Sequence, residues 1–454
     1  MAPFIFDDDR RSIGQSSNAA DDSPTIPSNL GDTGPLSPPT NLTSEPLQPA
    51  PAHPSPDTTR DHVEDISVAL EWKLLFPLLS RGSTDPQPSD PRPIITACTD
   101  DAGSPGDQAR LEQVHELVAQ TIREAGERAV TAHALRQDGA EEKDVWATAW
   151  VVKKANSAEP LTEEAQLASR GYVWVPVEIC SPRMRFCEAR TRARMCAVLE
   201  ALRASHRLAA NASCEVHVHL GRMDGRAWTL STLQRLGSML WLAEPALRSI
   251  RDPNSPNFAN VYTWGFAMRE QSRLALLVAK DVSMAAATHL IPDQQISEAV
   301  RAHPTAASKD VAALVAIWRK TSHLDLGRLL SGPERKYRRL GFNFSAFGEE
   351  DERAMRNPRT MEFRMMDGSV DTELIAGWLT ICGTIVATAV ADGDPRYGTA
   401  FSLLLSRTAP QRTQAGLQET EGNRLAREFG ELMQALGIDG QHYRGFQEKI
   451  RREH

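Results

Sequence analysis

The chain has 454 residues, of which 41% are hydrophobic and 24% are charged, and its formal net charge is −8. This length is enough for one large domain or two ordinary ones, and the composition is that of a soluble globular protein. The acidic balance argues against a nucleic-acid partner, because proteins that bind the phosphate backbone concentrate Lys and Arg.

The cysteines and the N-terminus indicate the compartment. The six cysteines are sparse and show no CxxC spacing (Cys98, Cys180, Cys187, Cys196, Cys214 and Cys382), which fits a reducing environment. The first residues, MAPFIFDDDRRS, lack the basic and then apolar regions of a secretory signal. We therefore expect a cytoplasmic protein.

Composition also divides the chain. Residues 1–62 are rich in Pro, Ser, Thr and Asp and hold too few large apolar side chains to offset the entropy of ordering, so they are predicted to be a disordered leader. Residues 63–405 are predicted to form one large folded domain. The more polar stretch 406–454 reads as a helical C-terminal tail.

One segment, residues 374–391, is uncharged over about the minimum length of a membrane span. Threonines recur in it every four residues, and Gly377 and Gly383 interrupt the apolar run. A helix buried on most sides of a large core explains this pattern better, so no membrane partner is expected.

Hydrophobic periodicity predicts interleaved strands and helices. Strands are expected within 66–77, 127–135, 144–154, 171–182, 212–221, 338–347 and 360–368, and helices within 108–126, 187–206, 228–247, 310–320 and 374–391. The order lacks the strict alternation of a parallel sheet. It favours an α+β fold with a largely antiparallel sheet.

Two of the predicted strands carry carboxylates inside apolar runs. Glu71 and Lys73 in LEWKLLFP share one face, because residues two apart on a strand point the same way. Glu178 lies in VPVEICSP. A buried carboxylate is costly unless it is paired or binds a metal. A salt pair at Glu71 and an exposed edge at Glu178 are the simpler alternatives.

Two more strands carry same-face pairs, His217 with His219 in HVHLG and Glu362 with Arg364 in MEFRMMDG. Imidazole binds divalent metals when it is neutral and donates hydrogen bonds when it is charged. A carboxylate for a cation and a guanidinium for a phosphate suit nucleotide chemistry. Structural histidines and a plain salt bridge remain the alternatives.

The motifs ALEWKLLFP, VEICSP, HVHLG, TLSTLQRL…WLAEP and MEFRMMDGSVD occur in this order over about residues 65–392. Together they resemble the amidoligase family of carboxylate–amine ligases, which is related to glutamine synthetase and glutamate–cysteine ligase. The resemblance is to its divergent, fungal-type members. It implies a glutamine-synthetase-like domain whose sheet forms an active-site funnel flanked by helices.

The resemblance implies an ATP-dependent ligase that acts through an acyl phosphate, with ATP and Mg²⁺ or Mn²⁺ as cofactors. Its substrates would be a small-molecule carboxylate and an amine, or a carboxylate of a peptide or protein. Matching the motifs residue by residue gives the metal ligands as Glu71, His217 and Glu362, with Glu178 at a second cation. It gives the catalytic residues as Arg364 and His219, and the nucleotide contacts as Arg364 and Asn343.

The chain departs from the family pattern at Lys73, where the family has a second Glu. An ammonium cannot bind a cation and would repel one, unless it replaces that cation. After the EP helix, Arg251 stands with either Asn254 or Asn257 as the family's polar pair. These departures leave open a catalytically eroded pseudoenzyme, or a nucleotide- or metal-binding module of the same fold.

A third interpretation is a zinc hydrolase that uses His217, His219 and a carboxylate. The HxH pair suggests it. The sequence lacks a third protein ligand at the usual helix or loop spacing.

Overall fold

The computed structural model describes residues 60–99, 104–253, 267–333, 339–348, 359–409 and 419–454. The leader predicted for residues 1–62 lies outside these ranges except for its last three residues. The chain divides into two units, Met1–Arg60 and Asp61–His454. All the elements below belong to the second unit.

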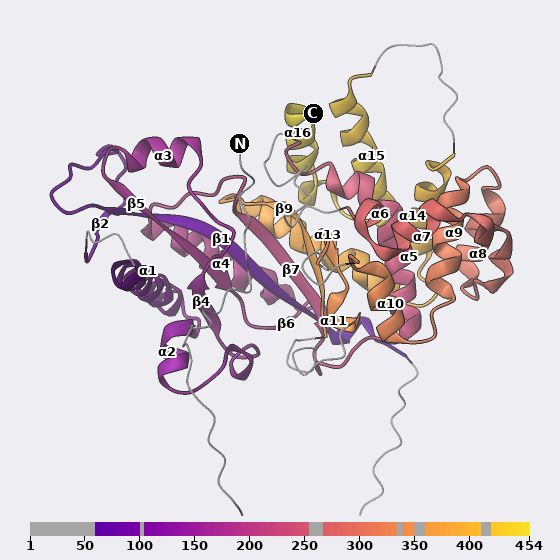
Figure 1. The fold of residues 1–454 in the computed structure, drawn as a ribbon, viewed down its shortest axis with the longest axis horizontal. Helices are drawn as coiled ribbons and strands as arrows, with labels where there is room; N and C mark the ends of the chain where they lie inside the picture. Colours follow the sequence, from indigo (N-terminus) through magenta and orange to yellow (C-terminus); the bar gives the residue numbers. More distant parts are fainter. Residues whose placement is uncertain (1–59, 100–103, 254–266, 334–338, 349–358, 410–418) are drawn as a thin grey trace, which may run out of the picture. The chain divides into compact units, whose positions relative to one another are not determined.

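One sheet organises this unit, and its longest strand is β1 (Ile66–Leu79). The strand order is β3-β4-β5-β1-β7-β9-β8, with two short strands, β2 and β6, pairing with β1 (Figure 1). The other strands are β2 (Ile95–Thr96), β3 (Ala129–Thr131), β4 (Trp150–Lys154), β5 (Tyr172–Cys180), β6 (Met184–Arg185), β7 (Glu215–Arg222), β8 (Phe342–Asn343) and β9 (Met361–Asp367). Among the described strands only β3–β4 and β1–β2 pair in parallel. The predicted mixed fold with a largely antiparallel sheet is confirmed.

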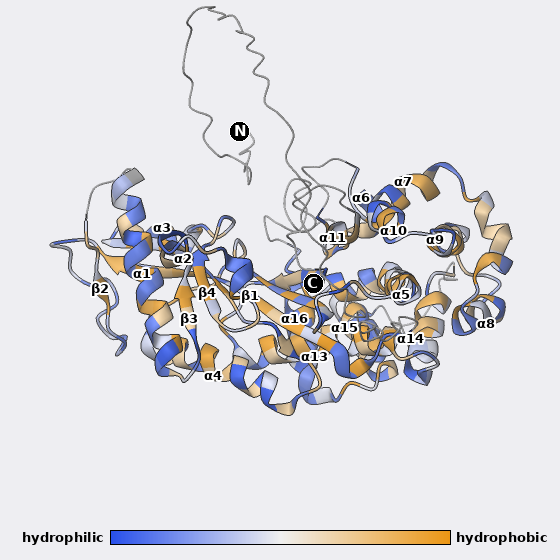
Figure 2. Cartoon of the chain, turned by 90° about the horizontal axis from the view of Figure 1, so that it is seen from below, coloured by the Kyte–Doolittle hydropathy of each residue, from blue (hydrophilic) through white to orange (hydrophobic). Residues whose placement is uncertain are grey.

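The two faces of the sheet differ in chemistry because side chains alternate along each strand. On β1, Leu70, Trp72 and Leu74 are fully buried in the main core, whereas Glu71 and Lys73 point to the opposite face. Three helices cover the apolar face: α1 (Ser104–Glu124), α4 (Ala189–Ser205) and α13 (Thr372–Val390). Figure 2 shows α4 and α13 along this side of the sheet.

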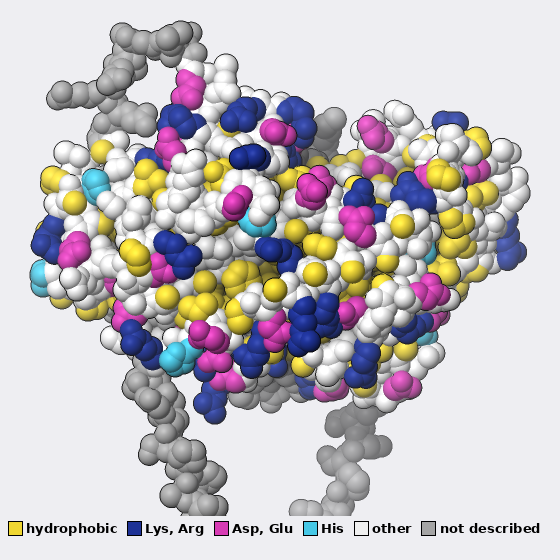
Figure 3. Space-filling model, turned by 180° about the vertical axis from the view of Figure 1, so that it is seen from behind, with side chains coloured by type: hydrophobic (Ala, Val, Ile, Leu, Met, Phe, Trp, Pro, Cys, Tyr) yellow, Lys and Arg dark blue, Asp and Glu magenta, His cyan; other side chains and the backbone are white. Residues whose placement is uncertain are grey.

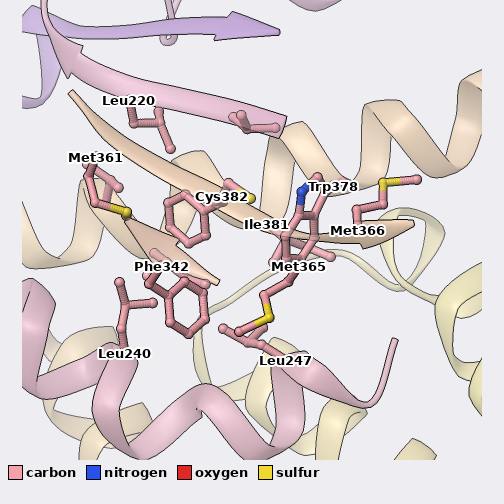
Figure 4. Packing of buried hydrophobic residues seen from close by; sticks show 14 of the residues in the cluster. Leu220, Leu240, Leu247, Phe342, Met361, Met365, Met366, Trp378, Ile381 and Cys382 are labelled. Carbon is pink, nitrogen blue, oxygen red and sulfur yellow. The ribbon is translucent and has the colours of Figure 1, made fainter. Parts of the chain in front are cut away.

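Helix α13 is long and apolar enough to cross a membrane, yet 72% of its apolar window is buried inside the protein. Its Trp378 ring lies edge-on to Phe363 of β9, with 6.1 Å between the ring centroids. Figure 4 shows Trp378, Ile381 and Cys382 packed beside β9. These contacts agree with the predicted core helix.

Helix α5 (Leu230–Arg248) packs against the β8–β9 end of the sheet. Figure 4 shows Leu240 and Leu247 of α5 beside Phe342 and Met365. Further helices surround α5 or follow it: α6 (Met268–Gln271), α7 (Arg273–Lys280), η3 (Ser283–Leu290), α8 (Gln294–Ala302), α9 (Ser308–Trp318), α10 (His323–Leu330), α11 (Ser345–Gly348) and α14 (Pro395–Ser406). The C-terminal elements are α15 (Glu421–Ala435), η5 (Gly440–His442) and α16 (Arg444–Glu453).

Three predicted strands are shorter than expected. Within 144–154 the strand begins only at Trp150, and helix shortens the other two. Within 127–135 the strand ends at Thr131, whose side-chain oxygen accepts a hydrogen bond from the Ala134 N–H and caps α2 (Ala132–Gln137). Within 338–347 only Phe342 and Asn343 are extended before α11 begins. In both segments a local turn of helix overrides the apolar alternation.

The outer surface of the helical side mixes Lys and Arg with Asp and Glu, interspersed with apolar side chains (Figure 3). A typical pair is Arg194 with Glu127, whose nearest charged atoms are 2.7 Å apart. Exposed pairs of this kind contribute roughly 0–1 kcal/mol each. The buried core, rather than these pairs, therefore stabilises the fold.

The contact between α13 and η5 gives a test of the core packing. A methyl group at Gly377 would meet the backbone oxygen of His442 at 2.3 Å. We expect Gly377→Ala to destabilise the protein by about 1–3 kcal/mol, because backbone must move. Urea unfolding followed by circular dichroism would measure the change.

The matched control is Gly398→Ala in α14, where the added methyl group would meet only the flexible side chain of Gln295. That change should be neutral or stabilising by up to about 1 kcal/mol, because alanine favours helix over glycine. Equal changes in the free energy of unfolding for the two substitutions would contradict the close contact between Gly377 of α13 and His442 of η5.

Candidate functional site

The polar face of the sheet carries charged side chains on adjacent strands because the cross-strand register aligns them. Glu178 of β5 is opposite both Lys153 and Lys73, Glu71 of β1 is opposite both Cys180 and His217, and Glu362 of β9 is opposite both His219 and Asn343. Side chains opposite one another on paired strands lie on the same face. Residues distant in the sequence are thus brought into one cluster.

Two carboxylates and two imidazoles form its centre. Glu71 Oε2 is 3.1 Å from His217 Nδ1, and Glu71 Oε1 is 3.0 Å from His219 Nε2. Glu362 Oε1 is 3.1 Å from His217 Nδ1 and 3.7 Å from His219 Nε2. Each imidazole therefore lies between the same two carboxylates.

Three of these side chains could hold a cation together. One ligand atom each of Glu71, His219 and Glu362 lies within 4.8 Å of the other two. Carboxylate oxygens with an imidazole nitrogen suit divalent cations. His219 Nδ1 lies 3.2 Å from the Thr360 hydroxyl, a contact that orients Nε2 toward Glu71, as second partners orient metal-binding histidines.

His217, which the motif match assigns as a metal ligand, is fully buried below this group. Its Nε2 is 2.9 Å from Glu215 Oε2. The side chains of His219 and Glu71 are 20% and 24% exposed. His219 is thus the imidazole that a cation from solvent can reach, while His217 supports the two carboxylates from beneath.

Glu178 belongs to a second group, with Glu71 and Cys180, whose ligand atoms also lie within 4.8 Å of one another. Its carboxylate is 3.3 Å from Lys153 Nζ and accepts a long contact from the Cys180 thiol, at 3.5 Å. Lys153 also pairs with Glu142 at 2.9 Å. The structure therefore places Glu178 beside Glu71, with a lysine at its other side.

Glu215 is a site residue that the motif analysis missed. It is fully buried, and its Oε2 faces His217 at 2.9 Å, Lys73 at 3.5 Å and Arg364 at 3.9 Å. The signal was present in the sequence, because Glu215 stands two residues before His217 and so shares its strand face.

Lys73 lies beside this buried carboxylate and donates a hydrogen bond to Ser157 Oγ at 3.2 Å. Its charge is therefore compensated by Glu215 on the neighbouring strand. The repulsion of a cation expected at Lys73 is reduced by this pairing.

Arg364 is buried and pairs with Glu362, and more weakly with Glu215. It lies in a β-bulge, because β9 has one residue more than β7 between the pairs Val216–Met366 and Val218–Phe363. Bulges often re-aim side chains beside functional sites. Here the bulge places Arg364 on the polar face while both following methionines remain buried.

Asn343 orients Glu362. Its Nδ2 donates to Glu362 Oε2 at 2.7 Å, and its Oδ1 accepts from the Ser345 N–H at 2.9 Å. Arg251 is also buried, with its Nε 3.3 Å from Asp367 Oδ1. Asn254 and Asn257 lie outside the described residues.

Glu71 and Glu362 are held ionised. Burial raises the pKa of Glu71, but the charge of His219 and hydrogen bonds from both histidines outweigh it and hold that pKa well below its usual range. Burial likewise raises the pKa of Glu362, and Arg364 and His219 outweigh it. Charged carboxylates are the form that binds a cation.

A comparison with protein families gives a match to part of the chain. The family model described as "Putative amidoligase enzyme" matches residues 108–274. The matched stretch includes Glu178, His217 and His219, whereas Glu71 and Glu362 lie on either side of it. No curated protein matches the chain.

His217 gives a pH-dependent prediction for the metal-free protein. Burial, Arg364 and Lys73 lower its pKa, but hydrogen bonds to Glu215 and Glu362 outweigh them and raise the pKa to about 8. The raised value means that protonated His217 stabilises the fold. This stabilisation is complete below the unfolded pKa of about 6.5 and is lost as the pH rises through about 8.

We expect the free energy of unfolding to fall by about 2 kcal/mol across this range. Urea titrations with a chelator, below and above it, would measure the fall in the wild type and in His217→Gln. The variant should show a smaller dependence on pH. An identical dependence in both proteins would contradict the assignment.

Proposed function

We propose that this chain is an ATP-dependent ligase of the amidoligase type, which joins a carboxylate to an amine through an acyl phosphate. The match of residues 108–274 to the amidoligase model supports this proposal. The observation that carries the proposal is the group of Glu71, His219 and Glu362 on the polar face of the sheet. Mg²⁺ or Mn²⁺ is the cation that this oxygen-rich donor set suits.

The chemical fit of a cation rests on the charges around that group. Glu71 and Glu362 bring two ionised carboxylates to one place, and the structure balances them with imidazoles and with Arg364. A bound divalent cation would neutralise the ATP phosphates and polarise the transferred phosphoryl group. It would compete with Arg364 for Glu362, which leaves the guanidinium available for phosphate oxygens.

The reaction has two steps. An oxygen of the substrate carboxylate attacks the γ-phosphorus of ATP, and the bond between that phosphorus and the β-phosphate oxygen breaks to release ADP. The amine nitrogen then attacks the acyl carbon, the bond to the phosphate oxygen breaks, and the nitrogen loses a proton to solvent. Small-molecule substrates and a carboxylate of a peptide or protein both satisfy this chemistry.

Each side chain of this face has a role in the proposal. Asn343 and His217 fix the orientation of the two carboxylates, and Arg364 stabilises the charge of the phosphoryl group. Glu178 lies on the side of the carboxylate substrate. The zinc-hydrolase alternative is not favoured, because both nitrogens of His217 face carboxylates and only His219 faces the opening.

The second candidate is a catalytically eroded pseudoenzyme of the same fold, and Lys73 is the observation that favours it. Its ammonium lies where the family resemblance implies a carboxylate, and it pairs with the fully buried Glu215. In the leading proposal the Lys73–Glu215 pair replaces a second cation. In the second candidate the same pair disables the site.

Nucleotide binding tests the leading proposal directly. In calorimetry, wild-type protein should bind Mg-ATP, and Glu362→Gln should weaken binding by at least about tenfold, because one of three ligand side chains loses its charge. Glu116→Gln is the control, since Glu116 lies exposed on α1, on the helix-covered side of the sheet. Binding that is absent in the wild type would reject the proposal.

Substituting Lys73 separates the two candidates. Lys73→Glu places a carboxylate beside buried Glu215, so we expect it to destabilise the protein by roughly 3–5 kcal/mol. Lys73→Glu combined with Glu215→Gln avoids that repulsion and is the informative variant. A site that evolved around Lys73 should bind Mg-ATP in the wild type and less tightly in the double variant. Binding only in the double variant would favour the eroded site.

A further inference from the structure

The charged cluster continues beyond the candidate cation site into the body of the protein. Glu215 Oε1 is 3.7 Å from Arg251 Nη2, and Arg251 Nε is 3.3 Å from Asp367 Oδ1. None of these four atoms makes a hydrogen bond within the described part of the chain. Their attraction therefore depends on where the backbone holds Arg251 and Asp367.

Arg251 is fully buried and follows α5 by three residues. Its Nη1 donates to the Arg364 carbonyl oxygen at 3.2 Å, so the guanidinium contacts the bulge of β9 as well as Glu215. A buried arginine must be matched by acceptors, because an uncompensated buried charge is costly. Arg251 therefore fixes the spacing between Glu215 of β7 and the bulged end of β9.

The last helix, α16, holds both ends of this arrangement. Lys449 Nζ is 2.9 Å from Asp367 Oδ2 and donates to the Ile250 carbonyl oxygen at 2.6 Å. Asp367 Oδ2 also accepts from the Asp252 N–H at 3.0 Å. His454 Nε2 lies 3.2 Å from the carbonyl oxygen of Arg251. The turn that carries Arg251 is thus held between β9 and α16.

We infer that Lys449 is a positioning residue for the candidate cation site, acting through Asp367 and Arg251 on the Glu215–His217 pair. The inference rests on the proposed function, because it concerns how tightly the same site binds its cation. His217 contacts both Glu71 and Glu362 at 3.1 Å. A displacement of Glu215 would therefore move the His217 imidazole, and this in turn would shift Glu71 and Glu362.

Lys449 can be changed without removing the anchors of α16. Phe446 and Ile450 are buried, and the Phe446 ring centroid lies 6.2 Å from that of Trp378 and 6.1 Å from that of Phe429. The side chain of Lys449 is 18% exposed. The apolar contacts should keep α16 in place when the ammonium is removed.

The experiment measures the affinity for Mn²⁺ and the melting temperature of the full chain and its variants. Lys449→Met should weaken Mn²⁺ binding roughly threefold to tenfold, which is less than the effect of losing a direct partner of a metal ligand, because Lys449 acts through several residues. Lys449→Arg should restore most of the affinity. The control is Arg452→Met, which removes one positive charge from the same helix at a side chain that is 72% exposed.

The sign of the effect separates positioning from simple electrostatics. Removing a positive charge near a cation site should tighten cation binding by Coulomb's law, whereas loss of positioning should weaken it. Tighter or unchanged binding by Lys449→Met, or weakening equal to that of Arg452→Met, would overturn the inference. If Lys449→Met does not fold, Lys449→Gln replaces it, because it also removes the positive charge, and it should weaken Mn²⁺ binding to a similar extent.

The failure of the proposed function has a different outcome. Wild-type protein that binds no Mn²⁺ would reject the cation site itself. Wild-type protein that binds Mn²⁺, together with variants that bind it equally and melt at the same temperature, would reject only the role of Lys449.

Discussion

The register of β1 against its two neighbours is the constraint on which the site depends. Glu71 is opposite His217 on one side and Cys180 on the other, while Trp72 is opposite Val216 and Ile179. A slip of one residue would move Glu71 and Lys73 of β1 into the core and would move the core residues of the strand to the polar face. The burial of Leu70, Trp72 and Leu74 therefore fixes the position of the charged cluster as firmly as any contact within it.

The cluster is close to electrically balanced before any ligand arrives. Glu71 and Glu362 share two imidazoles, and Glu215 faces Lys73, Arg364 and Arg251. Buried charges persist only when each has a partner, so every member limits where the others can lie. A cation that enters this network must replace existing partners of Glu71 and Glu362. Its affinity therefore depends on the free energy needed to break those contacts.

Strand periodicity was enough to predict that His217 shares a face with His219, and Glu362 with Arg364, because residues two apart on a strand share a face. It could not show that these strands pair with one another and with β1, which depends on the register of the sheet. Periodicity also could not predict which of the two histidines a cation can reach. That depends on the contacts of His217 with Glu215 and of His219 with Thr360, and on which imidazole is buried. Helices α6 to α8 lie between the predicted helices within 228–247 and 310–320, and the sequence analysis did not predict them. Lys449 was beyond prediction because it meets Asp367 across 82 residues, by tertiary packing alone.

The site is assembled from both ends of the folded unit, with Glu71 on its first strand and Lys449 on its last helix. During synthesis the ribosome delivers these parts in order, and domains generally fold as units. Some three hundred more residues must therefore be synthesised after Glu71 before Glu362 of β9 can join it. The residues of α16 are made later still. A nascent chain that has not yet reached Glu362 lacks one of the three side chains of the candidate cation site, so the site is completed late relative to its first strand.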